Sequence, residues 1–267
     1  MLPFDYQRAQ DLDDAERRLA DDENALLLAG GMTLLPTMKM RLAMPSTLID
    51  LNGIAALRGV RTHADGLEIG AMTTHAAVAA DPLVRDHLPG LAELAARIGD
   101  PQVRNRGTLG GSLANSDPAA DYPAAVLACN ATIVTRRREI PADEFFFDLF
   151  ETALEPGEIV TAVRFPPVAR AAYAKFANPA SRYALAGVMV AADGDGWRVA
   201  VTGAGSCAFR HAGLEAALAR EFTPAALDGV EIDARAFNDD LHASADYRAA
   251  LVRAMAQRAV ARLSGSA

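Results

Sequence analysis

Cysteine is almost absent from this chain, which has only Cys129 and Cys207 in 267 residues. Two thiols exclude a framework of several disulfides, and they cannot alone supply the four ligands of an iron–sulfur cluster or of a thiolate zinc site. Histidine is also sparse, and its positions show neither metal-ligand spacing nor the order of a Ser-His-Asp triad. These positions are His63, His75, His87, His211 and His242. The sequence therefore predicts no metal site and no catalytic residue in this chain.

Long apolar runs and long basic runs are missing as well. No stretch reaches the roughly 18–20 uninterrupted apolar residues of a membrane span, and residues 1–10 lack the basic and apolar regions of a leader peptide. The formal net charge is −8, and the basic cluster Arg136-Arg137-Arg138 fits a solvated turn. We therefore expect a cytoplasmic protein with no membrane span and no nucleic acid partner.

Helical and strand-like patterns alternate along the chain, and hydrophobic residues make up 51% of it, enough for two or three small cores. The predicted fold class is α+β. A strand expected over 158–165 ends at Pro166-Pro167, which is the best candidate for a linker. Beyond this linker we expect strands over 173–176, 185–192 and 197–202, with helices over 211–219, 224–227 and 246–263.

Two short segments that contain glycine pairs are the most informative feature present. They are Ala29-Gly30-Gly31-Met32-Thr33 and Thr108-Leu109-Gly110-Gly111-Ser112. Each pair is predicted to lie in a loop whose backbone approaches something closely, and each segment ends in a hydroxyl residue that could cap a following helix. A single segment of this kind is usually only a tight connection. Together they predict one phosphate-bearing ligand that is held from two sides.

The second segment lies in an unusually polar run over 98–121. Successive backbone N–H groups in such a run can form a concave anion site, and its hydroxyl and carboxylate groups could hold a polyol or a ribose. Two other features look functional but are interpreted as structural. The run 203–208 matches the dinucleotide pattern G-x-G-x-x-G/A, but no βαβ continuation follows, so we expect a strand-to-helix turn. Phe145-Phe146-Phe147 is expected in the core.

Taken together, five separated motifs resemble one known family, the FAD-binding medium subunits of molybdenum hydroxylases, such as those of aerobic carbon monoxide dehydrogenase and xanthine dehydrogenase. The motifs are the runs 29–36 and 98–121, the turn and strand at 154–159, Lys175-Phe176, and the run 240–248. The resemblance implies an FAD-binding domain over 1–167, of the type found in vanillyl-alcohol oxidases, with two α/β subdomains (about 1–54 and 55–167). It also implies a smaller α/β domain over 168–267, with a three-stranded antiparallel sheet and helices.

The resemblance further implies which residues bind FAD. Two glycine-bearing segments would hold the pyrophosphate and adjoining groups through backbone N–H donors, and three polar side chains match positions near the cofactor. The resulting set is Leu28, Ala29, Gly30, Gly31, Met32, Thr33, Leu34, Thr108, Leu109, Gly110, Gly111, Ser112, Asn115, Asp121 and Lys175. Asp121 could instead be an acid at a helix start beside Pro123, and Lys175 an ordinary exposed strand lysine. Met32 departs from the family, which commonly has His or Gln there.

By the same resemblance, the substrate chemistry belongs to partner subunits. A large subunit would carry a cofactor of the molybdopterin cytosine dinucleotide type, and a small subunit would carry 2Fe-2S clusters that pass electrons to the FAD of this chain. Quinone, NAD or oxygen would accept them, and the assembly would be a dimer of heterotrimers. Two alternatives stay open: a self-contained flavin-dependent oxidase, and a non-catalytic assembly subunit that has lost its flavin.

Overall fold

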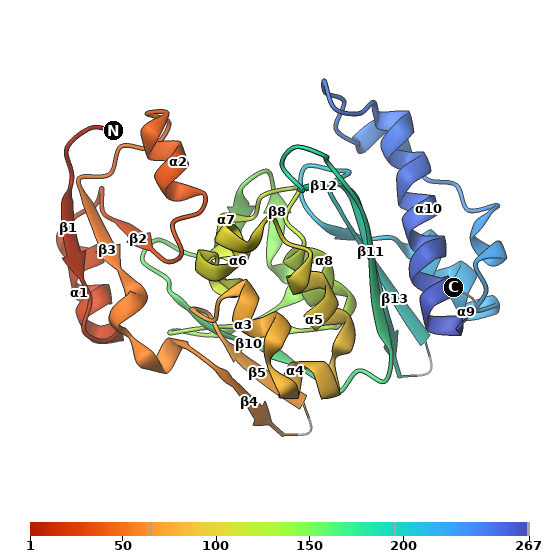
Figure 1. Ribbon diagram of the computed structural model, residues 1–267, viewed down its shortest axis with the longest axis horizontal. Helices are drawn as coiled ribbons and strands as arrows, with labels where there is room; N and C mark the ends of the chain where they lie inside the picture. Colours follow the sequence, from red (N-terminus) through yellow and green to blue (C-terminus); the bar gives the residue numbers. More distant parts are fainter. Residues whose placement is uncertain (65, 195, 266–267) are drawn as a thin grey trace.

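The computed structural model describes residues 1–64, 66–194 and 196–265. Asp65 and Asp195 lie outside the described residues. Three units follow one another along the chain and also lie side by side in space (Figure 1). The N-terminal unit is drawn in red and orange, the middle unit in orange through yellow to green, and the C-terminal unit in teal and blue.

The N-terminal unit is a small parallel sheet in the strand order β1-β3-β2. Its elements are β1 (Asp5–Arg8), α1 (Leu12–Asp21), β2 (Leu26–Leu28), α2 (Leu34–Lys39) and β3 (Thr47–Asp50). The central strand β3 is buried along its whole length, as expected for a parallel strand covered on both faces. Since β2 lies at the sheet edge and leads directly into α2, the first glycine segment forms the connection between these two elements.

The middle unit is an antiparallel five-stranded sheet, in the order β4-β5-β10-β6-β7, with a layer of short helices against it (Figure 1). The strands of this sheet are β4 (Val60–His63), β5 (Gly66–Gly70), β6 (Thr132–Thr135), β7 (Glu139–Pro141) and β10 (Val160–Phe165). The helices are α3 (His75–Ala80), α4 (Pro82–His87), α5 (Pro89–Ala96), α6 (Pro101–Arg106), α7 (Leu109–Asn115) and α8 (Tyr122–Ala128). A separate hairpin pairs β8 (Phe146–Asp148) with β9 (Glu151–Thr152).

Many of these helices begin where a polar side chain accepts a hydrogen bond from the first turn. Thr74, Asp81, Asp100 and Thr108 cap α3, α4, α6 and α7 in this way. Such caps let six- and seven-residue helices form, because a short helix has few internal hydrogen bonds to hold it. Some of the polar residues in the run 98–121 therefore serve as helix caps.

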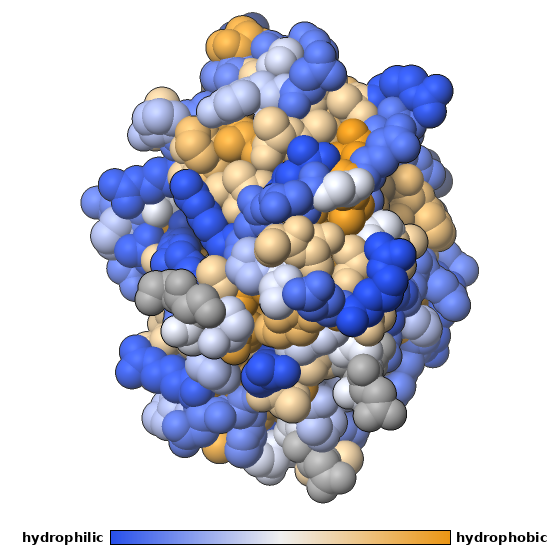
Figure 2. All heavy atoms as spheres, turned by 90° about the vertical axis from the view of Figure 1, so that its right-hand side faces the viewer, coloured by the Kyte–Doolittle hydropathy of each residue, from blue (hydrophilic) through white to orange (hydrophobic). Residues whose placement is uncertain are grey.

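The C-terminal unit is an antiparallel sheet that is buried on both faces. It consists of β11 (Ala171–Ala177), β12 (Ala184–Asp193), β13 (Gly196–Thr202) and β14 (Phe209–Arg210), with α9 (Ala212–Arg220) and α10 (Ala245–Ser264). Val188 and Val190 of β12 pack with residues of α10, whereas Met189 packs with the core of the middle unit. This two-sided burial explains why β12 is almost continuously apolar. On the side where this unit faces the viewer, hydrophilic and apolar residues are interspersed (Figure 2).

The structure differs from several sequence-based expectations. The C-terminal sheet has a fourth strand, β14, which is only two residues long and gives no periodic signal. The residues at 224–227 form a 3-10 turn rather than an α-helix. The 203–208 segment leads into β14 before α9 begins, so it is not a direct strand-to-helix turn. Phe145 is fully buried as expected, but Phe147 is 59% exposed on the β8–β9 hairpin.

The arginine cluster lies in the turn between β6 and β7, as predicted, but it also makes specific contacts. Arg136 pairs with Asp13 and Glu16 of α1, which links the middle unit to the N-terminal unit. Arg138 pairs with the buried carboxylate of Glu158 at 2.9 Å. The cluster therefore contributes to the relative placement of the first two units.

Candidate cofactor site

The two glycine segments lie in direct contact, although they belong to different units. A Cβ atom on Gly30 would clash with the backbone carbonyl of Arg106, just before the second segment. A Cβ on Gly111 would lie 3.3 Å from the Cβ of Ala29. Glycine is needed at position 30 because only a residue without a side chain allows this close backbone approach. The structure thus brings together the two segments that the sequence placed around one ligand.

The first segment exposes a row of unused backbone donors. None of the described residues accepts a hydrogen bond from the backbone N–H groups of residues 30–34. Gly31 adopts a left-handed conformation with φ of +74°, which turns the chain sharply between β2 and α2. Consecutive N–H groups at a turn of this kind form a concave anion site. We call residues 30–34 the amide cradle.

The second segment is not the predicted loop but the start of helix α7. The Thr108 hydroxyl caps this helix by accepting a hydrogen bond from the Gly111 N–H. The N–H groups of Leu109 and Gly110 donate to the carbonyls of Thr73 and Ala71, at 3.1 and 2.8 Å. These amides are therefore already satisfied within the protein, and the idea that they bind a pyrophosphate is not supported by the geometry.

The glycines of α7 serve packing instead. A Cβ on Gly110 would lie 2.5 Å from the Cβ of Ala71, so this glycine lets the helix lie against the end of β5. Gly111 and Asn115 are four residues apart and share the helix face turned toward Ala29. The side chains of Ser112 and Asn115 are half-buried, and no described residue forms a hydrogen bond with either side chain. They are the polar groups that α7 can offer beside the amide cradle.

Asp121 and Lys175 form a buried ion pair with a 2.9 Å separation, and each side chain is only 4% exposed. The Tyr173 hydroxyl also donates to the Asp121 carboxylate. Burial raises the pKa of the Asp121 carboxyl, and the Lys175 ammonium group acts in the opposite direction. Asp121 stands at the N-cap position of α8, as the structural alternative from the sequence has it, but its side chain makes no cap hydrogen bond with a described residue and pairs with Lys175 instead. Lys175 is buried, so it is not an exposed strand lysine.

Lys175 also ties together segments that are distant in the sequence. Besides Asp121, its ammonium group donates to the carbonyls of Arg97 and Arg182, both at 3.0 Å. All three of its donors therefore have acceptors within the protein. The lysine fixes the loop between β11 and β12 against the end of α5 and the start of α8.

This β11–β12 loop carries a residue that sequence reasoning missed. Tyr183 is 44% exposed, and its hydroxyl group lies near the side chain of Thr33 in the amide cradle. The loop thereby closes the cradle from a third side. A lone aromatic residue at the end of the polar run 178–182 was the signal available in the sequence. Asn52 was also missed, although its side-chain amide donates to the Ala29 carbonyl at 3.0 Å.

Two buried polar groups beneath the second segment have no partner in the described chain. They are Nδ1 of His75 and the hydroxyl of Tyr122, whose rings lie 5.2 Å apart. The backbone N–H of His75 donates to the carbonyl of Gly107 at 2.9 Å. Burial lowers the pKa of His75 to about 4, and the nearby Arg104 lowers it further, so the imidazole is neutral at pH 7.

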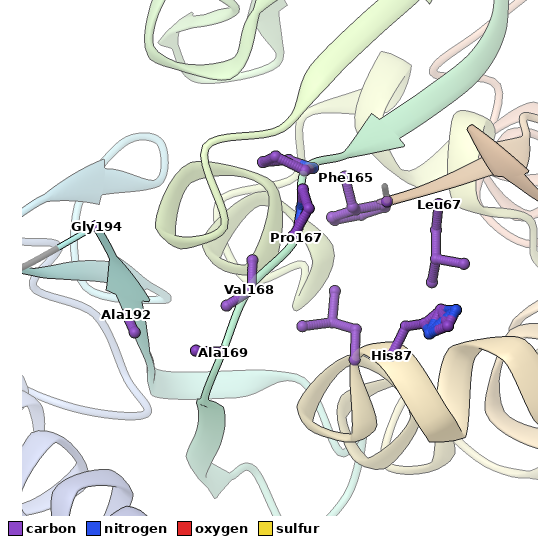
Figure 3. Close-up of a pocket in the computed structure, with 11 residues that line it drawn as sticks. Leu67, His87, Phe165, Pro167, Val168, Ala169, Ala192 and Gly194 are labelled. Atoms are coloured by element: carbon purple, nitrogen blue, oxygen red, sulfur yellow. The ribbon is translucent and has the colours of Figure 1, made fainter. Parts of the chain in front are cut away.

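A cavity of about 410 Å³ lies away from the glycine segments, at the seam between the middle and C-terminal units. Figure 3 shows Leu67 and His87 on one side of it, and the connection through Pro167, Val168 and Ala169 on the other. None of the residues of the amide cradle lines this cavity. Separately, none of the helices in the described part of the chain is long and apolar enough to cross a membrane.

Comparison with known proteins identifies close relatives over the whole length. A sequence model of the family described as "FAD binding domain in molybdopterin dehydrogenase" matches residues 2–168. The carbon monoxide dehydrogenase medium chain of Hydrogenophaga pseudoflava is 38% identical, with 97% of each chain covered. The nicotine 6-hydroxylase medium subunit of Paenarthrobacter nicotinovorans is 37% identical and covers 96% of this chain and 95% of its own length.

Solved structures agree with this comparison. A chain of carbon monoxide dehydrogenase from Hydrogenophaga pseudoflava superposes with a TM-score of 0.88 at 36% identity, covering 100% of this chain and 99% of that one. A chain of reconstituted CO dehydrogenase from Oligotropha carboxidovorans gives a TM-score of 0.90 at 32% identity, with both chains fully covered.

Proposed function

Because this chain belongs to the family of FAD-binding medium subunits of molybdenum hydroxylases, we propose that it receives electrons from a 2Fe-2S partner subunit and delivers them from FAD to an external acceptor. The family resemblance inferred from the sequence is confirmed, and with it FAD as the cofactor and an oxidoreductase complex as the setting. Bound FAD exchanges electrons one or two at a time, so it can join iron–sulfur carriers to a two-electron acceptor.

The amide cradle is the single observation that supports FAD binding by residues of this chain. Five consecutive N–H groups that find no acceptor among the described residues fit a pyrophosphate, because they offer donors to a group that carries negative charge and has many acceptor oxygens. Gly30 and Gly31 keep side chains away from this surface. Ser112 and Asn115 of α7 would add side-chain hydrogen bonds to adjoining parts of the cofactor.

For Asp121 and Lys175 we propose a positioning role. All three donors of the Lys175 ammonium group have acceptors within the protein, and Asp121 balances its charge. This geometry does not favour a direct hydrogen bond from Lys175 to the flavin. Instead the pair holds the β11–β12 loop, and this loop places Tyr183 against Thr33. Leu109, Gly110 and Gly111 were also predicted to bind the cofactor, and we propose that they instead hold α7 in place beside the amide cradle.

The proposed partners are a small 2Fe-2S subunit and a large subunit with a cofactor of the molybdopterin cytosine dinucleotide type, assembled as a dimer of heterotrimers in the cytoplasm. Relatives named as medium chains or subunits of dehydrogenase complexes support this proposal. Substrate oxidation would then take place on the large subunit. We also propose the domain division at residues 167 and 168, where β10 ends and Pro166-Pro167 begins the connection to β11.

The test is to purify the tagged chain from its source cells together with its companions. Acid extraction and chromatography then measure FAD per chain, and metal analysis measures iron and molybdenum. We expect one FAD per chain, together with iron and molybdenum in the same particle. An assembly that contains iron and molybdenum but no flavin would favour the non-catalytic alternative. Substrate oxidation by the isolated, FAD-loaded chain would favour the self-contained oxidase.

A further inference from the structure

The segment around α2 has a composition unlike that of the rest of the chain. The whole protein has 34 acidic residues and a net charge of −8, yet residues 25–49 contain no acidic residue. The same window contains Lys39 and Arg41 as well as half of the eight methionines. It is therefore a locally cationic, methionine-rich region on an acidic protein.

Five apolar residues of this window are exposed, and together we call them the methionine patch. They are Met32, Pro36, Met40, Leu42 and Met44. Met40, Leu42 and Met44 are 64%, 74% and 65% exposed, although apolar side chains of this size are usually buried. Pro36 and Met40 are four residues apart, so they lie on the same side of α2 and its C-cap, and Met32 lies just before the helix begins. Lys39 and Arg41 are exposed among them.

The backbone beneath the patch is ordered by hydrogen bonds, so the exposed side chains are held in place by the fold. The N–H groups of Met40 and Leu42 donate to the carbonyls of Pro36 and Thr37, each at 3.0 Å. Met38 points inward and is buried against Leu28 and Leu48. In Figure 1, α2 stands at the edge of the molecule, with no other element over its outer side. A fixed, exposed apolar patch with charged neighbours is typical of a protein interface.

We propose that the methionine patch is the docking surface for the iron–sulfur subunit, through an apolar groove whose rim carries carboxylates. This inference rests on the proposed function. The patch begins at Met32, which is itself part of the amide cradle, so a protein seated on it lies beside the bound cofactor. Lys39 and Arg41, with no acid in the surrounding window, select a partner of opposite charge. Methionine side chains suit such a contact because they adapt to an irregular surface.

The test uses the complex purified through a tag on this chain. Two double variants disrupt the patch: Met40→Glu with Leu42→Glu, and Lys39→Glu with Arg41→Glu. The matched control is Leu241→Glu, which changes a residue that is 90% exposed on the C-terminal unit. On dilution, both double variants should release the iron–sulfur subunit at concentrations at least tenfold higher than the unchanged complex, as measured by native mass spectrometry. The control should release it at the unchanged concentration.

Hydrogen exchange gives a second measurement that does not depend on how the variants fold. Amides of residues 40–44 should exchange more slowly in the complex than in the free chain. If both double variants dilute like the unchanged complex, or if residues 40–44 show no protection, the patch is not the docking surface. If the unchanged chain never copurifies with an iron–sulfur subunit, the proposed function fails instead.

Two further outcomes would assign the patch to another occupant. Vesicles of phosphatidylethanolamine and phosphatidylglycerol that bind the unchanged chain, but not the variants, would make it a membrane surface if the complex stays intact. Self-association that is lost in the variants, while the iron–sulfur subunit is retained, would make it a contact between two copies of this chain.

Discussion

At the scale of single residues, the site depends on a few glycines with different tasks. Gly30 allows the backbone contact with Arg106, Gly31 supplies the left-handed turn, and Gly110 packs on Ala71. The sequence pattern singled out these glycines as important but did not distinguish their separate roles. A role of this kind depends on what lies opposite each Cα atom, and that neighbour comes from another unit of the chain.

Replacing Gly31 with valine should abolish FAD retention in the purified complex. The new side chain would meet Leu35 and would disfavour the positive φ, so the amide cradle would lose its shape. Gly59→Val is the matched control, because Gly59 also has a positive φ (+95°) but no atom within 4 Å of its Cβ position. FAD per chain after acid extraction is the readout. Full FAD contents in both variants would refute the amide cradle as the pyrophosphate site.

His75 should make stability depend on pH between about 6.5 and 4. Its folded pKa of about 4 lies below the ordinary value of 6.5, so the unfolded chain binds more protons in this range and stability falls as pH falls. The full effect corresponds to about 3 kcal/mol. Urea unfolding of the chain at pH 7.5 and 4.5 measures it, and His75→Gln should flatten the difference. An equally steep pH dependence in His75→Gln would show that another group is responsible.

At the scale of secondary structure, α7 is the element that sequence reasoning misjudged. Gly110-Gly111 is a poor helix sequence, and this favoured the prediction of a loop. The helix forms because Thr108 caps it and because Leu109 and Gly110 donate to the backbone of 71–73. Tertiary contacts thus outweigh a weak local propensity, whereas α10 has a strong 20-residue pattern and was predicted within two residues at its ends.

Loss of the α7 cap should weaken FAD binding. Thr108→Ala removes the acceptor for the Gly111 N–H, at a cost of about 1 kcal/mol in folding stability, and loosens the helix that carries Ser112 and Asn115. Ser244→Ala removes the corresponding cap of α10 and serves as the control. The FAD dissociation constant should rise for Thr108→Ala and stay unchanged for Ser244→Ala. A similar rise in both variants would mean that general loss of stability, and not α7, controls binding.

At the scale of the whole molecule, the sequence predicted the order of the parts better than their packing. The family motifs and Pro166-Pro167 indicated an FAD-binding region followed by a smaller unit. They did not indicate that β12 is sandwiched between α10 and the middle unit, or that the β11–β12 loop reaches the amide cradle. Such contacts join segments that are far apart in the sequence, and local periodicity carries no information about them.

The Asp121–Lys175 pair is the clearest of these long-range ties, and its removal should affect the whole fold. Lys175→Met leaves the Asp121 carboxylate buried without its cation, which should cost about 3–5 kcal/mol in unfolding free energy. The double variant with Asp121→Asn should recover much of this loss, because the buried charge is gone. Urea unfolding of the two variants and the unchanged chain tests the pair. No recovery in the double variant would show that Lys175 acts through its carbonyl contacts alone.

Amide hydrogen exchange of the purified complex, with FAD bound and after FAD removal, shows whether the cofactor contacts the amide cradle. We predict that bound FAD slows exchange of the amides of residues 30–34 at least tenfold, because the cofactor supplies acceptors that the described residues do not. The amides of Leu109 and Gly110, which already have protein acceptors, should change much less. Exchange at 30–34 that is the same with and without FAD would contradict the amide cradle as the pyrophosphate site.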